Sequence, residues 1–309
     1  MINEMKPDLL SGPQVTKPTP QEMVNSDIMS NYMNKNNIDK TTVDSFGAEW
    51  SRFSQDRLGD AEYSEIFESY FGIFPWAALP ANSEGFDMGC GSGRWAKMVA
   101  PRVGVLNCVD PSPDALAVAK RNLSDQPNTT FMNSGVSDCI LPEGSQDFGY
   151  SLGVLHHIPD TAAAMKSCTR LLKSGAPFLV YLYFRFDNKP RWYSWLWRAS
   201  NIVRIVIARC PEGLKNLLTD IIAVTVYFPL ARAAWFGAKM GLRIGNWPLS
   251  SYRNLSFYTM RTDSRDRFGT PLEQRFTRAE INDMMQNSGL ERIIFSRNVP
   301  YWCAVGYKT

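Results

Sequence analysis

Short apolar stretches alternate with amphipathic ones through the middle of the chain. Between residues 84 and 184 the apolar stretches read GFDMG, GVLNCVD, TTFMNSGV, DFGYSLGV and PFLVYLYF, and each has the length of a single β-strand. Helices are predicted to begin between them, near Ser92, Ser112 and Thr161. Because strands that alternate with helices form parallel sheets, the pattern predicts a doubly wound α/β domain.

Helical patterns continue on both sides of this region. Residues 43–80 alternate aromatic and charged positions at helical spacing, which predicts one or two amphipathic helices. A further helix is predicted over 277–290, with Thr277 and Glu280 as a capping box and Gly289 at its C-terminal end. Two strands, ERIIFSRNV and YWCAVGYK, then complete the α/β pattern.

Four parts follow from these patterns, and no internal repeat is visible. Residues 1–42 are rich in Asn, Pro, Lys, Ser and Met without periodicity, which predicts a flexible arm. Residues 43–184 are expected to form a helical cap and the α/β core, and residues 185–270 an apolar, basic helical insertion. Residues 271–309 are expected to complete the core.

Composition narrows the class of protein. With 309 residues, 44% of them hydrophobic and 20% charged, the chain matches soluble globular proteins and can bury a substantial core. A net charge of +3 gives no indication of a nucleic-acid partner. The six cysteines form no C-x-x-C pair, which predicts buried thiols in a reducing compartment rather than disulfides or a metal site. The N-terminus shows no basic stretch followed by an apolar one, so a cytoplasmic location is expected.

The stretch GFDMGCGSGRW places a glycine at every second position, between a predicted strand and a predicted helix. A turn of this kind lets a ligand approach bare backbone amides and the positive end of a helix. Asp87 would then face an ammonium group of the ligand, whose carboxylate would accept from the amides. A tight turn that needs glycine only for packing is the alternative. The candidate cofactor contacts here are Asp87, Gly89, Cys90, Gly91, Gly93 and Arg94.

Asp110 ends the next predicted strand, 17 residues after Gly93, and Pro111 follows it. A carboxylate at this strand end can accept from both hydroxyls of a ribose. Alone, such an aspartate is more often a cap for the following helix. Combined with the glycine loop, the position favours ribose binding.

The ends of the next two predicted strands are candidate contacts of a nucleobase. In SGVSDC, Val136 and Cys139 are expected to flank an adenine ring. Asp138 is expected to accept from its exocyclic amine and the Ser137 amide to meet a ring nitrogen. A plain loop is the alternative. Leu152 and Gly153, where the fourth strand ends, complete the predicted cofactor site.

The motifs DMGCGSG, VDPS, LPEGSQDF, VLHHIPD and LLKSGA follow one another as in class I S-adenosylmethionine-dependent methyltransferases, which this chain resembles over about residues 84–184 and again over 277–308. The resemblance implies a Rossmann-like, seven-stranded, mostly parallel sheet with an antiparallel last strand. It also implies S-adenosylmethionine as cofactor and S-adenosylhomocysteine as product. A weaker likeness is to bacterial methyltransferases of polysaccharide and glycan gene clusters. The chain departs from the family pattern in two places. The first strand has few apolar residues, and Ser174 and Ala176 stand where relatives usually have Pro and Gly.

Two groups of residues are candidates for the chemical step. A hydroxyl acceptor gains from a general base, and the chain's only two histidines, His156 and His157, follow the fourth predicted strand. Either could be the base, and either could instead hold the loop. The stretch RTDSRDRFGTPLEQRF adds Asp263 and Asp266 as further candidate bases and Arg267 as an acceptor contact. A salt-bridged loop is the alternative there.

The insertion is basic and rich in tryptophan. Residues 191–261 carry ten cations and two anions, a net charge of +8 that leaves −5 for the rest of the chain. Such helices are typical of segments that lie on anionic lipid, or of lids around an anionic or lipid-linked acceptor. A lid with its own small core, or a dimer contact, is the alternative. The apolar run 221–231 is too short to cross a bilayer and is expected to break at Pro229. Trp50 and Tyr258 are expected to contact the acceptor.

The sequence therefore predicts a methyltransferase that modifies a small-molecule or glycan-type acceptor, preferentially at oxygen. The alternatives are C-methylation of a quinone-like or lipid acceptor, an NAD-type oxidoreductase, and a binding protein without catalysis. The expected location is cytoplasmic, with peripheral contact at the inner face of the membrane through residues 191–243. The acceptor and the oligomeric state stay open.

Overall fold

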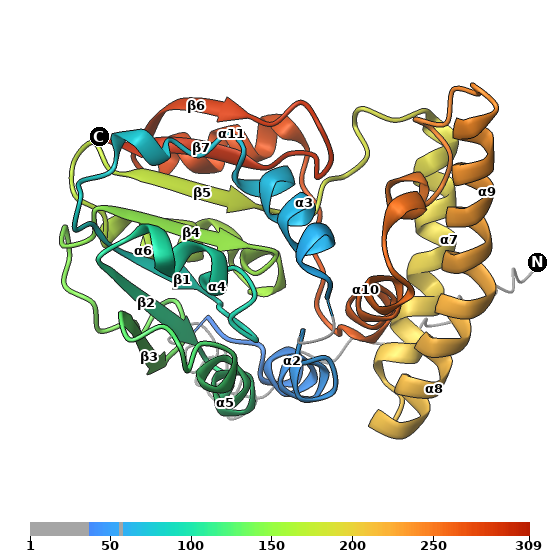
Figure 1. Ribbon diagram of the computed structural model, residues 1–309, viewed down its shortest axis with the longest axis horizontal. Coiled ribbons are helices and arrows are strands. Elements are labelled where there is room, and N and C mark those ends of the chain that lie inside the picture. Colours follow the sequence, from blue (N-terminus) through green and yellow to red (C-terminus); the bar gives the residue numbers. More distant parts are fainter. Residues whose placement is uncertain (1–36, 56–57) are drawn as a thin grey trace, which may run out of the picture. The chain divides into compact units, whose positions relative to one another are not determined.

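The computed structural model describes residues 37–55 and 58–309, so most of the predicted N-terminal arm lies outside the described residues. Its centre is one seven-stranded sheet in the order β3-β2-β1-β4-β5-β7-β6 (Figure 1). Only β7 runs antiparallel to its neighbours, β5 and β6. The predicted doubly wound, Rossmann-like fold is confirmed. The strands are β1 (Glu84–Met88), β2 (Val105–Asp110), β3 (Thr129–Asn133), β4 (Phe148–Leu152), β5 (Pro177–Tyr181), β6 (Leu290–Phe295) and β7 (Ala304–Lys308).

Helices cover both faces of the sheet and bury a separate apolar core on each. One core lies under α3 (Asp60–Phe71), α4 (Ala96–Val99) and α5 (Pro113–Asn122). The other lies under α6 (Thr161–Arg170) and α11 (Arg278–Asn287). Successive residues of a strand point to opposite faces, so Phe178 enters one core and Leu179 the other.

Glycines explain why the first strand has few apolar residues. A Cβ at Gly85 would lie 2.3 Å from the Phe148 ring, and one at Gly149 would lie 2.2 Å from the Phe86 ring. Each glycine on β1 or β4 therefore makes room for a phenylalanine of the neighbouring strand. The large rings supply the buried surface that the sequence of β1 alone does not show.

The ends of several helices follow the sequence, and two do not. The capping box of Thr277 and Glu280 is present, and Gly289 follows α11 with a φ of +77°. However, α4 has only four residues and begins at Ala96, after the glycine loop has been completed. The first described helix, α2 (Lys40–Arg52), begins inside the segment that was predicted as an arm.

The insertion folds into helices. They are α7 (Arg191–Ala208), α8 (Glu212–Ile222), a π-helical turn η4 (Ala223–Tyr227), α9 (Phe228–Lys239), a 3-10 turn η5 (Ser250–Asn254) and α10 (Phe257–Gly269). The segments α8, η4 and α9 form one continuous helix, Glu212–Lys239, of 28 residues. The predicted break at Pro229 is therefore wrong, because Pro229 lies in the first turn of α9, directly after the wide turn η4, where a missing N–H is tolerated.

Helix α10 connects the insertion to the rest of the molecule. It packs against α7 and α8 on one side and against α2 on the other. A small core within the insertion contains Ile207, Tyr227, Ala231, Met260 and Phe268. The remaining short 3-10 helices are η1 (Trp76–Ala78), η2 (Ala100–Arg102) and η3 (Leu155–His157).

Candidate functional site

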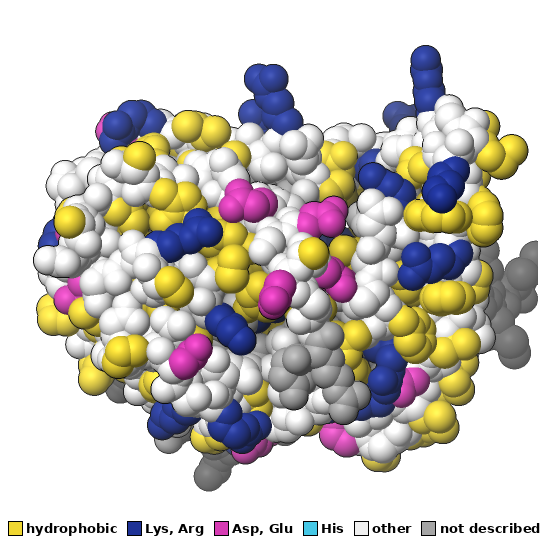
Figure 2. Space-filling model, viewed as in Figure 1, with side chains coloured by type: hydrophobic (Ala, Val, Ile, Leu, Met, Phe, Trp, Pro, Cys, Tyr) yellow, Lys and Arg dark blue, Asp and Glu magenta, His cyan; other side chains and the backbone are white. Residues whose placement is uncertain are grey.

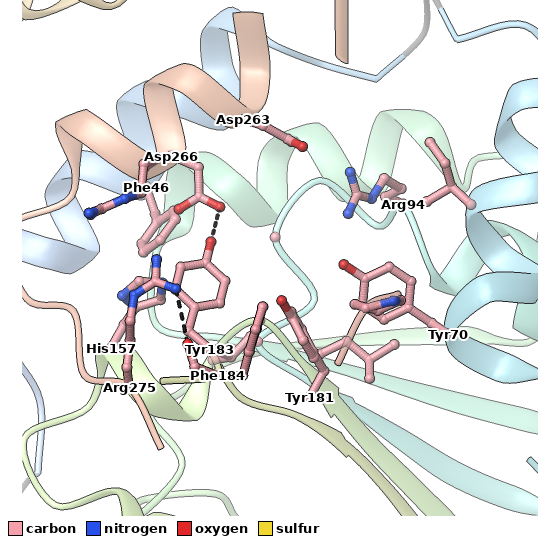
Figure 3. A pocket seen from close by; sticks show the side chains of 18 of the residues that line it. Phe46, Tyr70, Arg94, His157, Tyr181, Tyr183, Phe184, Asp263, Asp266 and Arg275 are labelled. Carbon is pink, nitrogen blue, oxygen red and sulfur yellow. Dashed lines mark hydrogen bonds between the residues drawn. The ribbon is translucent and has the colours of Figure 1, made fainter. Parts of the chain in front are cut away.

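A cavity of about 940 Å³ lies between the carboxyl ends of the strands and the insertion. Parallel α/β sheets usually bind ligands at this edge, and the volume lies within the usual range for small-molecule sites. Its core side is formed by the glycine loop and the ends of β2, β4 and β5, and its other side by α7, η4, α9, η5 and α10. Figure 3 shows the charged and aromatic side chains around its centre.

The glycine loop after β1 takes a left-handed backbone conformation at three positions. Gly89, Gly91 and Gly93 have φ angles of +82°, +54° and +76°. A Cβ at Gly91 would lie 2.8 Å from the Trp50 indole nitrogen, whereas one at Gly93 would meet Leu123 on the end of α5. Gly89, Cys90 and Gly91 line the cavity, but Gly93 is needed only for packing.

The loop offers fewer free amides than the sequence predicted. The Gly89 and Cys90 amides donate to the Val109 carbonyl, Gly91 donates to Asp110, and Gly93 donates to the Cys90 carbonyl. These hydrogen bonds fix the shape of the loop and leave those four amides unavailable to a ligand. The expectation that they bind the ligand's carboxylate is therefore not supported.

Arg94 is the cationic group beside the glycine loop, and it can bind the ligand's carboxylate in place of these amides. It lines the cavity and stacks on the Trp95 ring, 4.2 Å from its centroid. Its Nε is buried and has no hydrogen bond to any described residue. Figure 3 shows Arg94 and Asp263 facing each other across the cavity. A guanidinium in this position can bind a carboxylate.

Asp110 has two functions in this geometry. Its Oδ2 accepts from the Gly91 amide and its Oδ1 from the Ser112 amide, each at 2.8 Å, so it fixes the glycine loop and the start of α5. Burial raises its pKa to about 6. Asp110 also lines the cavity beside Pro111. Each carboxylate oxygen has two lone pairs, so both can still accept from ligand hydroxyls.

Asp87 does not reach the cavity, and the prediction that it faces a ligand's ammonium group is not supported. Its side chain is 1% exposed and lies beneath the glycine loop. Neither oxygen completes a hydrogen bond with any described residue, although the nearby Tyr150 hydroxyl lowers the pKa. Burial, with a smaller contribution from Asp110, raises the pKa of Asp87 to about 8.

This buried carboxyl should make stability depend on pH. Because the folded pKa of Asp87 is about 8 and the ordinary value is 3.8, unfolding near neutral pH releases a proton and becomes easier as pH rises. One such group contributes about 1.36 kcal/mol per pH unit within this window. Between pH 5 and pH 7, the unfolding free energy of the wild type should fall by about 3 kcal/mol more than that of Asp87→Asn.

Urea titrations of both proteins at the two pH values measure this difference. The comparison cancels any pH-independent packing effect of the asparagine. Equal pH dependence in the two proteins would show that Asp87 is ionised in the folded state.

The predicted nucleobase contacts are placed unequally. Val136, Leu152 and Gly153 line the cavity. Ser137 is half-buried and Asp138 is exposed, and neither lines it. The polar contacts expected from SGVSDC therefore do not form part of this cavity. Of that loop only Ser134, Gly135 and Val136 line it, and Cys139 is buried in the core instead.

The two adjacent histidines differ in position. His156 is completely buried outside the cavity lining, with its ring stacked on Tyr183 at 3.8 Å between centroids. His157 lines the cavity, and its Nδ1 lies 2.6 Å from the Leu272 carbonyl oxygen. A carbonyl only accepts, so Nδ1 carries the proton and the neutral ring has a lone pair on Nε2.

His157 also has the protonation state of a base. Burial lowers its pKa below the usual value of 6.5, although the Asp266 carboxylate opposes part of this effect. Nε2 is buried and has no hydrogen bond to any described residue. An imidazole fixed by a backbone carbonyl, with a free lone pair at a cavity wall, is suited to accept a proton.

A charged cluster lies beside His157. The Tyr183 hydroxyl donates to Asp266 Oδ2, while Asp266 Oδ1 has no partner among the described residues (Figure 3). Glu273 forms ion pairs of 2.8 Å with Arg267 and 2.7 Å with Arg275, which lowers its pKa despite burial. Both arginines line the cavity, but their charge is partly neutralised.

Asp263 is the other acidic side chain on this wall. Burial raises its pKa to about 6, and Arg94 and the Tyr252 hydroxyl oppose the effect. Asp263 and Asp266 lie on α10 three residues apart, so both reach the cavity from one helix face. The predicted charge cluster thus forms part of the site rather than an external loop.

The two predicted acceptor contacts outside this cluster have different positions. Trp50 lines the cavity over the glycine loop. Tyr258 does not line it, and its ring packs edge-on against Phe53. Tyr70, Tyr181 and Tyr183 line the cavity and were not predicted. Tyr181 and Tyr183 are two apart at the end of a strand, a spacing that signals a shared face.

No group of three His, Cys, Asp or Glu side chains among residues 37–55 and 58–309 has the geometry of a metal site. All six cysteines are free, and five of them are buried.

The core matches known proteins over part of its length. Residues 86–180 match the family model described as a methyltransferase domain. A ubiquinone biosynthesis O-methyltransferase of Nitrosomonas europaea is 33% identical over 110 residues, which cover 35% of this chain and 45% of that protein. Phosphoethanolamine N-methyltransferase 2 of Caenorhabditis elegans is 27% identical over 158 residues, or 49% of this chain and 34% of that protein.

This chain therefore spans less than half of the length of either relative. Among solved structures, the N-methyltransferase NodS from Bradyrhizobium japonicum, in complex with S-adenosyl-L-homocysteine, is 18% identical. That similarity covers 46% of this chain and 72% of the other, with a TM-score of 0.38.

Proposed function

We propose that this chain, whose residues 86–180 match a methyltransferase domain, transfers a methyl group from S-adenosylmethionine to a hydroxyl group of a small acceptor. One observation carries the proposal. One cavity is lined by the glycine loop, by Asp110 and by His157, whose buried Nε2 has no hydrogen bond to any described residue. The same cavity therefore contains a site for a nucleoside and a candidate general base.

The residues of the core fit this cofactor. Asp110 would accept from the ribose hydroxyls while it holds the loop through the Gly91 amide. Val136 and Leu152 supply apolar surface for the base. The unpaired Nε of Arg94 would bind the carboxylate of the amino-acid end. The match to the methyltransferase domain supports the same cofactor.

The bound cofactor supplies an electrophilic methyl group on a sulfonium centre. The protein must then place the acceptor hydroxyl and remove its proton as the oxygen–carbon bond forms. His157 Nε2 accepts that proton, and the Leu272 carbonyl stabilises the resulting imidazolium through Nδ1. The Tyr183–Asp266 pair lies beside His157 and orients the acceptor oxygen. Trp50 covers the loop and excludes water.

Oxygen is the favoured target because the site contains a base. The similarity to an O-methyltransferase over the core supports the same choice. A hydroxyl must lose a proton on methylation, which explains why a neutral histidine with a free nitrogen lies at the acceptor end.

Removing the Asp110 carboxylate should abolish most cofactor binding. In Asp110→Ala the Gly91 and Ser112 amides lose their partner, and the ribose loses its acceptor. We expect the Kd for S-adenosylmethionine to rise about a hundredfold, as two hydrogen bonds to a charged group are lost. Isothermal titration calorimetry measures this change.

Asp138→Ala is the matched control, since Asp138 is exposed and outside the cavity lining. Its Kd should equal that of the wild type. Tighter binding of NAD than of S-adenosylmethionine to the wild type would contradict the proposal and favour an oxidoreductase.

A further inference from the structure

The insertion exposes many large apolar side chains. Its exposed apolar side chains include Trp195, Ile202 and Val206 on α7 and Leu217, Ile221 and Phe236 on the long helix, and these six residues define the apolar face. Trp195 is 69% exposed and Phe236 61%. Large apolar patches on a soluble domain usually mark an interaction surface.

The long helix is amphipathic in the described structure. Lys215, Thr219, Ala223, Tyr227 and Ala231 are buried along one side. By length and composition the helix Glu212–Lys239 could cross a membrane, and the mean hydropathy of its most apolar 18-residue stretch is 1.5. Only 28% of that stretch is buried within the protein. Its other side is therefore available to a partner.

Ion pairs hold the buried side of this helix on the protein. Asp220, in the first third of the helix, pairs with Arg52 at 2.6 Å and Arg261 at 2.8 Å. Glu212 pairs with the buried Arg265 at 2.6 Å. A helix held in this way along its polar side can contact a bilayer with its apolar side while it lies in the interface.

The charges that accompany the apolar face have one sign. Every exposed charged residue between 191 and 243 is basic, namely Arg191, Arg198, Arg209, Lys239 and Arg243. The two acids of this stretch, Glu212 and Asp220, are the ones already used in ion pairs. Figure 2 shows basic and hydrophobic side chains together over α8 and α9. Two copies joined through this surface would bring like charges together, whereas anionic lipid would neutralise them.

Part of the cavity wall on the insertion is apolar and partly exposed. Leu196, Val226 and Leu230 are exposed by 46%, 41% and 39%, and all three also line the cavity. They form an apolar rim between the insertion helices and the polar cluster around His157. An amphiphilic molecule could therefore place its apolar part at the rim and its hydroxyl at the base.

We propose that the apolar face docks on an anionic lipid bilayer and that the acceptor is a hydroxylated amphiphile drawn from that bilayer. The docking is independent of the chemistry, and the identity of the acceptor rests on the proposed function. The long helix lies in the plane of the interface, with the five exposed cations at the level of the lipid headgroups.

Vesicle flotation with the full chain tests the docking without cofactor. The wild type should float with vesicles that contain phosphatidylglycerol and bind phosphatidylcholine vesicles more weakly. Trp195→Gln/Phe236→Gln should weaken binding to both about tenfold, because it removes the two most exposed aromatic anchors. Arg198→Gln/Lys239→Gln should weaken binding about fivefold per charge, and only to the anionic vesicles.

Ile140→Gln is the control, since Ile140 is 80% exposed on the core, and it should bind as the wild type does. Absence of flotation, or equal flotation of the aromatic variant, would overturn the docking. A dimer in sedimentation velocity that Trp195→Gln/Phe236→Gln dissociates would assign the face to a second copy and overturn it as well.

Transfer of a labelled methyl group tests the acceptor. The protein is incubated with S-adenosylmethionine labelled in its methyl group and membranes of its native cells, and the products are partitioned between chloroform–methanol and water. Label in the organic phase is expected. Label confined to the aqueous phase would overturn the lipophilic acceptor and leave the proposed function in place. No label in either phase would contradict the proposed function itself, whatever the vesicle result.

Discussion

His157→Ala should lower kcat by about 10² to 10⁴ without changing the affinity for S-adenosylmethionine, because a positioned general base contributes this much. His157 is the histidine that lines the cavity, and its Nε2 is free of hydrogen bonds to the described residues. His157→Gln should be equally slow, since a glutamine can donate to the Leu272 carbonyl but cannot accept the proton. Single-turnover methyl transfer and calorimetry give the two quantities separately.

The pH profile provides an independent readout of the same residue. His157 must be unprotonated to act, and its pKa lies below the usual value. The wild-type rate should therefore be flat near neutral pH and should fall once the pH drops below this lowered pKa, and the variants should lose this limb. His156→Leu is the comparison, and it should reduce stability rather than alter the profile, because His156 is buried outside the cavity lining. A wild-type rate in His157→Ala would eliminate this residue as the base.

Arg265→Met should reduce the free energy of unfolding by about 3 kcal/mol or more, the usual cost of removing one partner of a buried ion pair. Arg265 on α10 is completely buried and donates from Nη2 to both oxygens of Glu212 on α8. It also donates to Ser45 on α2 and lies 3.8 Å from Glu49. Without Arg265, its partners on α8 and α2 lose their hydrogen bonds and their neighbouring positive charge where these helices meet α10. Urea denaturation measures the change.

Arg261→Met is the matched control on the same helix. Arg261 pairs with Asp220, but its side chain is 30% exposed and Arg52 binds the same carboxylate. We expect a loss below about 1 kcal/mol, as for most exposed pairs. The double variant Glu49→Gln/Arg265→Met should recover part of the stability, because Glu49 is the buried carboxyl that loses its neighbouring cation, whereas the Glu212 side chain is 41% exposed. Equal losses in the two single variants would show that Arg265 contributes no more than a surface charge.

The sheet could be predicted because each strand has a recognisable local sequence pattern. The apolar stretches at GVLNCVD and DFGYSLGV are bounded by turn residues, and the glycine loop marks the first crossover. The same local signals predicted the cap at Thr277. By contrast, the depth of a side chain depends on neighbours distant in sequence. Asp87 was assigned to the ligand, although the structure buries it beneath the loop.

The sequence also did not show which way individual side chains point. His156 and His157 are adjacent, and only the 3-10 turn η3 determines which ring reaches the cavity. Asp138 was equally ambiguous, because nothing local shows that its side chain is exposed outside the cavity. The tyrosines at the end of β5 were missed, although their two-residue spacing was visible.

The wide turn η4 in the middle of the long helix has a geometric consequence. Residues four apart on a regular helix drift around its axis by about 40° per step, so a line of contacts at 215, 219, 223, 227 and 231 would wind away from a flat support. One turn of larger circumference sets back this rotation by roughly a residue. The buried residues at both ends of this 28-residue helix can then contact the same neighbour. The exposed residues at both ends then lie on one common side.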